Sequence, residues 1–290
     1  MAALLALHEV PLRRVPDTNL APTRSATLVR ASYARTLPTR APRQDGPGNG
    51  PRVLGLGDSI TVGVGDLVAP GHRPGWAAHV ARAVDSAHFA NLARLGARAR
   101  TVVDEQLPTA VQQRPDLALL CVGGNDVLRG DLDPADVAAS VRQCVHELLG
   151  VGCHVVLVRV PSAAHVRWLP TAVRRVLDDR VTLVNHGLDD VVAETAIPAL
   201  TLDSLEPTHP QLWHVDRIHP GPFGHRLLAQ RTLVEVAPRG IVAVEPVPPL
   251  TMRPPSRPAQ LGWLLRNGTP WLVKRSVDLG PALRRQMVAH

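Results

Sequence analysis

Cysteine, lysine and aromatic residues are scarce in this chain of 290 residues. The three cysteines, Cys121, Cys144 and Cys153, form no CxxC pair and show no metal-ligand spacing, which argues against a cysteine-bound metal. Their odd number, without a secretory signal, fits a reducing compartment. Aromatic residues make up only 3% of the chain, so alanine, valine and leucine must fill the core. Lys274 is the only lysine, and arginine therefore carries nearly all of the positive charge.

Long apolar runs are also absent. No stretch approaches the roughly 20 residues that span a bilayer. The first residues, MAALLALHEVPLRR, contain a short apolar run with no basic segment before it, whereas a signal peptide needs a basic segment followed by a longer apolar one. These absences predict a cytoplasmic protein without a transmembrane segment.

The net charge of +7 is compatible with a nucleic-acid partner. The arginines, however, are spread along the chain, and a basic patch needs local density to attract a polyanion. We therefore expect no nucleic-acid partner. One alternative stays open, namely a nucleic-acid-binding protein that uses an arginine-rich N-terminal arm between Arg13 and Arg43. Salt-dependent retention on DNA would support it.

Composition divides the chain into three parts. Residues 1–50 are rich in Pro, Arg, Thr and Ala and end in a cluster of turn-forming residues, which indicates a flexible arm and linker. Regular patterning occupies residues 51–240 and predicts one globular domain. Residues 241–290 begin with a proline-rich linker. Their end, Leu261–Val277, is expected to form a helical extension packed on the domain, with a basic membrane-surface helix as the alternative.

Apolar runs and helical periodicity alternate through the central part of the chain. The strands expected from the apolar runs are Arg52–Leu56, Ala87–Leu92, Asp116–Val122, His154–Val160 and Ala199–Leu202. The helices expected from the periodicity are Gly75–Val84, Pro134–Leu149 after an Asp133 cap, Arg180–Glu194 and Pro222–Val236. This alternation predicts an α/β fold with a parallel sheet and helices on both faces. Binding and catalytic residues of such folds lie at the carboxyl ends of the strands.

Three of these strand ends carry polar or glycine-rich sequences. Ser59 lies in Gly-Asp-Ser-Ile-Thr, directly after the first strand, so its hydroxyl is expected at the carboxyl edge. Asn125 lies in Gly-Gly-Asn-Asp after the third predicted strand, where its amide can donate a hydrogen bond into the same cleft. Gly96, in Asn-Leu-Ala-Arg-Leu-Gly, would offer an unhindered backbone N–H. Each signal alone is no more than a turn sequence.

A histidine with a nearby carboxylate supplies the base that a serine nucleophile needs. Asp216 precedes His219 by three residues, a spacing that lets the carboxylate orient the imidazole ring. The same spacing occurs in Glu206–His209, which stays open as the rival pair. We prefer His219, because the helix that follows it would hold it in place.

Histidines cluster in this region, so a metal site was weighed against a catalytic one. The cluster comprises His209, His214, His219 and His225 together with Glu206 and Asp216. Its spacings match no compact ligand pattern such as HExxH. We therefore expect no metal at this cluster.

Taken together, the four stretches resemble the motif blocks of the GDSL, or SGNH, hydrolase superfamily, whose blocks are centred on Ser, Gly, Asn and His. They occur here in the family's order, at Ser59, Gly96, Asn125 and His219. Two departures are Ile60 in place of the family's Leu and a lengthened Pro-x-Gly-His helix start after His219. The resemblance covers residues 52–236 and implies a flavodoxin-like three-layer sandwich with a central parallel sheet.

The resemblance also implies a role for each motif residue. Ser59 would be the nucleophile, His219 the general base and Asp216 the residue that aligns His219. Ser59 N–H, Gly96 N–H and the Asn125 side chain would form the oxyanion hole. The implied reaction is hydrolysis of a small-molecule carboxyl ester or thioester with a small to medium acyl group.

A deacetylase acting on a carbohydrate or another polar acetylated substrate is the alternative. Only Trp168 and Trp213 offer an aromatic platform for a sugar near the cleft. The oligomeric state is not indicated by the sequence.

Overall fold

The computed structural model describes residues 50–67, 72–166, 168–202 and 211–250, together with seven single positions, Ser256, Pro258, Leu261, Gly262, Leu265, Arg266 and Gly280. The expected N-terminal arm, including its arginines, lies outside these residues. So do Glu206, His209 and nearly all of the expected C-terminal helical extension. The division of the chain into three parts therefore stays a prediction.

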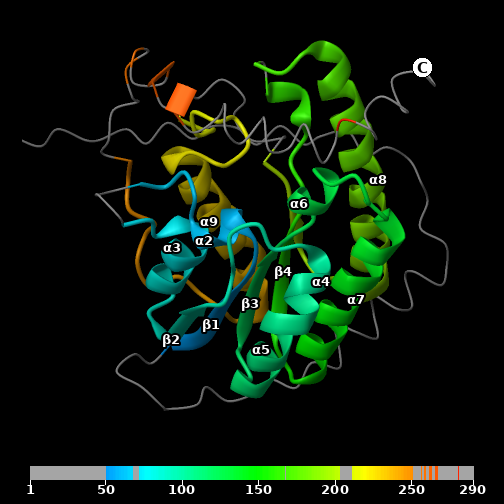
Figure 1. Ribbon diagram of the computed structural model, residues 1–290. Coiled ribbons are helices and arrows are strands. Elements are labelled where there is room, and N and C mark those ends of the chain that lie inside the picture. The colour runs from blue at the N-terminus through cyan, green and yellow to red at the C-terminus, as the bar shows by residue number, and fades with distance from the viewer. Residues whose placement is uncertain are drawn as a thin grey trace, which may run out of the picture.

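A five-stranded parallel sheet forms the centre of the molecule, with strand order β2-β1-β3-β4-β5 (Figure 1). The strands are β1 (Gly50–Gly57), β2 (Ser86–Asn91), β3 (Leu117–Cys121), β4 (His154–Val158) and β5 (Ala199–Leu200). All five residues of β3 are buried, as expected for a central strand covered on both faces.

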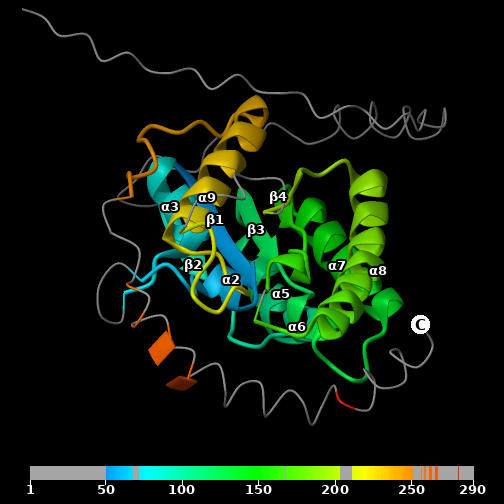
Figure 2. The ribbon, with the colours of Figure 1, turned by 90° about the horizontal axis from the view of Figure 1, so that it is seen from above.

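Helices cover both faces of this sheet (Figure 2). One face packs against α3 (Gly75–Ala83) and α9 (Pro222–Val236). Trp76 of α3 is fully buried in the hydrophobic cluster between this face and the two helices. The other face packs against α7 (Pro134–Gly150), α8 (Thr171–Thr195) and the segment α4 (Ala99–Thr101), η1 (Val102–Gln106) and α5 (Leu107–Gln113). Shorter helices are α2 (Ser59–Val62), α6 (Gly124–Val127), η2 (Ala163–His165) and η3 (Ala237–Arg239). The expected three-layer α/β fold with a parallel sheet is confirmed.

Local sequence explains where the helices begin. The Asp133 side chain accepts hydrogen bonds from the N–H groups of Ala135 and Asp136, so it caps α7 while Pro134 fills the first helical position. Helix α9 begins at Pro222 and ends at Val236, as expected. No helix in the described part of the chain is long and apolar enough to cross a membrane.

Two helical segments differ from the sequence-based expectation. Helix α8 begins at Thr171 rather than Arg180. Its buried residues Leu177, Val181, Val184 and Leu188 are spaced by four, three and four, and this pattern begins before Arg180. The helical segment Ala99–Gln113 was not expected, because Pro108 interrupts its pattern. The proline is tolerated since it stands in the first turn of α5, where a missing N–H costs no hydrogen bond.

Candidate active site

Ser59 stands where β1 meets α2, at the carboxyl edge of the sheet. The turn before it depends on Gly57, whose φ is +120° and whose added Cβ would lie 1.9 Å from the Cys121 carbonyl oxygen. Only glycine fits there. Asp58 then caps α2, because its Oδ1 accepts a hydrogen bond from Ile60 N–H at 3.0 Å. Ser59 is thereby fixed as the first residue of the helix.

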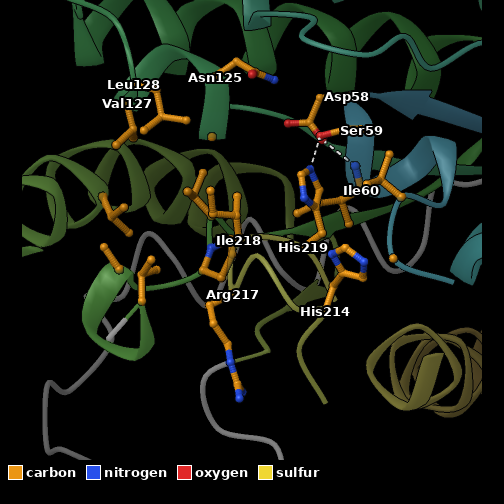
Figure 3. A pocket seen from close by; sticks show the side chains of 18 of the residues that line it. Asp58, Ser59, Ile60, Asn125, Val127, Leu128, His214, Arg217, Ile218 and His219 are labelled. Atoms are coloured by element: carbon orange, nitrogen blue, oxygen red, sulfur yellow. Dashed lines mark hydrogen bonds between the residues drawn. The ribbon is translucent and has the colours of Figure 1, made fainter. Parts of the chain in front are cut away.

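The His219 ring points toward Ser59 (Figure 3). Its Nε2 lies 2.8 Å from Ser59 Oγ, and its Nδ1 lies 2.8 Å from Asp216 Oδ2. The other carboxylate oxygen of Asp216 accepts the backbone N–H groups of Ile218 and His219 at 2.9 and 3.0 Å. The three sequence-predicted residues are therefore joined in one hydrogen-bonded chain.

Asp216 is almost fully buried and is held as a carboxylate. Burial opposes its ionisation, but the contacts with His214 and His219 outweigh burial and lower its pKa well below the usual range. His214 Nδ1 lies 3.0 Å from the same Oδ2 that faces His219. Because an ionised carboxylate only accepts hydrogen bonds, His219 Nδ1 carries the ring proton. Nε2 is then free to accept the proton of Ser59.

The three predicted oxyanion donors also line the cavity above Ser59. Ser59 N–H is the first of its helix and has no acceptor within that helix. Gly96 has a φ of +76° and open space around its Cα. Asn125 Nδ2 donates one hydrogen to the Ala97 carbonyl at 3.0 Å, which leaves its second hydrogen for a ligand.

A further carboxylate, Asp126, locks the loop that carries Gly96. Its Oδ1 accepts from Arg98 Nε at 3.0 Å, and its Oδ2 accepts from Ala99 N–H at 3.1 Å. Two neighbours in sequence, Asn125 and Asp126, therefore have different tasks. Asn125 faces the cavity, while Asp126 holds the loop opposite. The sequence singled out only the first of them.

Another buried carboxyl group, that of Asp58, precedes Ser59 in the chain. Asp58 is 3% exposed, and its burial raises its pKa to about 6, against the lowering effect of Ile60 N–H and of nearby His219. It lines the cavity but contacts neither His219 nor Ser59 through a hydrogen bond between side chains in the described residues.

The cavity holds about 620 Å³ and runs from Ser59 toward α8. Its far part is lined by aliphatic side chains from α6, the chain between β4 and α8, and α8 itself, namely Val127, Val160, Val166, Leu169, Leu177 and Val181. An apolar wall with a few polar groups at one end is the usual form of a small-molecule site.

Both predicted sugar platforms have partners in the structure. Trp213 is only 8% exposed, and its ring stacks on His165 with centroids 3.7 Å apart. Trp168 donates its indole N–H to the Asp216 carbonyl at 3.0 Å. Both tryptophans therefore support the loop that carries His219.

The remaining histidines form no metal site within the described residues. His225 is fully buried between α9 and the α2–α3 connection. His79 pairs with Asp66 at 2.7 Å. The rival pair Glu206–His209 lies outside the described residues.

Comparison with known proteins agrees with this geometry. Residues 56–227, more than half of the chain, match the GDSL-like Lipase/Acylhydrolase family. The chain belongs to this family, as the motif resemblance predicted. No curated protein matches the sequence.

Several solved structures share the fold. An α/β hydrolase enzyme, LAE5, from the metagenome of Lake Arreo, Spain, is 18% identical, with 65% of this chain and 95% of that chain covered and a TM-score of 0.53. The lipase/acylhydrolase from Enterococcus faecalis is 21% identical, with 65% and 96% covered and a TM-score of 0.51. A mutant of Axe2, an acetylxylan esterase from Geobacillus stearothermophilus, is 21% identical, with 64% and 94% covered and a TM-score of 0.51.

Proposed function

We propose that this protein hydrolyses carboxyl esters or thioesters of small to medium acyl groups through an acyl-enzyme on Ser59. The hydrogen-bonded chain from Ser59 through His219 to Asp216 carries the proposal. A serine hydroxyl is a weak nucleophile until an adjacent base takes its proton. His219 Nε2 is within reach of that proton, and the family membership of the chain supports ester cleavage in general.

In the proposed reaction, Ser59 Oγ attacks the acyl carbon while its proton passes to His219 Nε2. The imidazolium that forms lies against the Asp216 carboxylate, which stabilises the new charge. His219 then gives the proton to the departing alcohol or thiol, and the acyl group remains on Ser59. Water attacks this acyl-enzyme with His219 again as base, which releases the carboxylic acid and restores the serine.

The negative charge that develops on the acyl oxygen requires hydrogen-bond donors. We assign this task to Ser59 N–H, Gly96 N–H and the second amide hydrogen of Asn125. One such donor is typically worth about 3 kcal/mol, or about 10²–10³ in rate. The loop contacts of Asp126 support the proposal, because they fix Gly96 opposite Asn125.

The aliphatic end of the cavity is the proposed acyl site. A buried methylene gains about 0.8 kcal/mol, so each further acyl carbon that enters this space favours binding. The alternative, a deacetylase acting on a carbohydrate, draws on the similarity in fold to an acetylxylan esterase. It has less support, because Trp213 is buried under His165 and cannot offer its face to a sugar.

A series of p-nitrophenyl esters from acetyl to dodecanoyl tests this function. We expect the wild type to turn over these esters with an optimum beyond acetyl, and Ser59→Ala to lower kcat by about 10⁴-fold or more while it stays folded. Acetylated xylooligosaccharides form the second arm of the assay. A folded Ser59→Ala variant with full activity would refute the serine mechanism, and a preference for the acetylated sugar would favour the deacetylase.

A further inference from the structure

At two places in the sheet the chain extends beyond the end of a neighbouring strand, and in both a side-chain amide pairs with the extension. Strand β2 ends at Asn91, which pairs with Gly55 of β1. The last part of β1, up to Gly57, therefore has no β2 residue beside it. Strand β3 ends at Cys121, which pairs with Val158 of β4. The chain after β4 therefore continues to Val160 with no β3 residue beside it. Both extensions lie at the carboxyl edge that carries the candidate site.

At the first extension, the Gln106 side chain replaces the missing strand. Gly57 N–H donates to Gln106 Oε1 at 2.8 Å, and Gln106 Nε2 donates to the Gly57 carbonyl at 2.9 Å. A carboxamide offers one acceptor and one donor side by side, as a peptide group does. Gln106 is 1% exposed and ends the π-helical turn η1. Turns of this rare type are frequent at functional sites.

The Gly57 carbonyl also accepts from the backbone N–H of Arg94 at 3.1 Å. Gly57 comes two residues before Ser59, and Arg94 comes two residues before Gly96. The backbone of Gly57, which Gln106 holds on both its N–H and its carbonyl, therefore joins the strand of the proposed nucleophile to the loop of a proposed oxyanion donor. A change at Gln106 would displace both at once.

At the second extension, Asn185 of α8 makes the same pair of bonds. Val160 N–H donates to Asn185 Oδ1 at 3.0 Å, and Asn185 Nδ2 donates to the Val160 carbonyl at 2.9 Å. The Val160 side chain lines the aliphatic end of the cavity. Asn185 therefore holds part of the proposed acyl site in place and does not hold the nucleophile.

We propose that Gln106 and Asn185 are two positioning residues with separate tasks: Gln106 sets the geometry of Ser59 and Gly96, and Asn185 sets the wall of the acyl site at Val160. This inference rests on the proposed ester hydrolysis. Displacements of about 1 Å in a reacting group can cost about 10²-fold in rate, whereas a displaced apolar wall changes the preference between acyl groups.

Near-isosteric variants separate the two tasks. Gln106→Met and Asn185→Leu keep the size of each side chain and remove its amide. Gln143→Met makes the same substitution at an exposed position of α7 and serves as control. Gln106→Asn keeps the carboxamide but draws it back by one methylene and adds no charge, so it provides a milder variant if Gln106→Met does not fold. Thermal unfolding establishes that each variant is folded.

Kinetics with acetyl and octanoyl p-nitrophenyl esters, and the rate at which a fluorophosphonate labels Ser59, give the readout. For Gln106→Met we expect kcat and the labelling rate to fall by about 10–100-fold for both esters, with an unchanged octanoyl-to-acetyl ratio of kcat/KM. Gln106→Asn should lie between this variant and the wild type. For Asn185→Leu we expect that ratio to fall by about 10-fold through a higher octanoyl KM. Gln143→Met should match the wild type.

A folded Gln106→Met variant with wild-type kcat and labelling rate would overturn the inference. So would equal changes in the octanoyl-to-acetyl ratio for Gln106→Met and Asn185→Leu, since the tasks would then not be separate. Failure of the proposed function shows itself differently. The wild type would then neither turn over the esters nor label at Ser59, and both proposals would fall.

Discussion

The carboxyl group of Asp58 is buried next to the proposed nucleophile, and its burial should make the stability of the protein depend on pH. Burial raises its pKa from 3.8 to about 6 in the folded protein. Between these two values the folded state binds more protons than the unfolded state, so stability must fall as the pH rises through this window. The pKa of Asp58 is about 2 higher in the folded than in the unfolded state, which corresponds to a loss of about 3 kcal/mol in the free energy of unfolding once the pH lies above the folded pKa.

The substitution Asp58→Asn removes the charge but keeps the cap. Its side-chain oxygen can still accept the hydrogen bond from Ile60 N–H, and Asn is among the best N-cap residues. We expect the free energy of unfolding of Asp58→Asn to exceed that of the wild type by up to about 3 kcal/mol near pH 8, and to equal it near pH 4. Urea unfolding followed by circular dichroism at intervals of about one pH unit measures this difference.

A matched control is Asp133→Asn, which makes the same change at the exposed N-cap of α7. The free energy of unfolding of Asp133→Asn should stay close to that of the wild type at every pH. The reasoning would be refuted by a pH-independent difference for Asp58→Asn, since burial of the carboxylate would then not be the dominant cost. It would also be refuted by a variant less stable than the wild type near pH 8.

Three further predictions concern the reaction. Asp216→Asn should lower kcat by about 10⁴-fold with little change in KM, because the amide favours the wrong tautomer of His219. Steady-state kinetics across the ester series measure this loss, and a loss of kcat below tenfold would contradict the role assigned to Asp216. Val181→Phe should shorten the preferred acyl chain by filling the aliphatic end of the cavity, and an unchanged octanoyl-to-acetyl ratio would place the acyl group elsewhere. Incubation with EDTA should leave activity unchanged, and a loss that zinc restores would indicate a metal site that involves the rival histidines.

The sequence predicted the framework of the fold because the central strands carry a strong signal. Residues Leu117–Cys121 and His154–Val158 are nearly continuous apolar runs, and burial on both faces requires such runs. Helix α9 was located correctly because Pro222 marks its start. The order of the strands in the sheet, and therefore which strand ends meet, is not written in any local pattern.

The candidate site was predicted only in part. Ser59 and Asn125 stand in glycine-containing turns at strand ends, and His219 stands just before the proline that begins α9, where polar residues attract attention. Gln106 stands beside acidic residues and close to a proline, so nothing in the local sequence marks it as buried, and its partner Gly57 lies 49 residues away. His214 was seen only as one member of a histidine cluster, and its contact with Asp216 depends on the path of the loop. Contacts between distant backbone and side-chain atoms leave no periodic trace in the sequence.

The histidines near the C-terminus show most directly why partners, rather than spacing, decide function. His219 and His225 lie six residues apart in the same glycine- and proline-rich stretch. Both ring nitrogens of His225 have backbone partners, since Nδ1 accepts from Trp76 N–H at 3.2 Å and Nε2 donates to the Val64 carbonyl at 2.9 Å. Burial lowers its pKa to about 4, so it stays neutral near pH 7 and joins α9 to the segments before and within α3. A ring with both nitrogens engaged has no lone pair for a serine proton. His219 differs in both contacts, because its Nδ1 faces the Asp216 carboxylate and its Nε2 faces the Ser59 hydroxyl instead of a carbonyl.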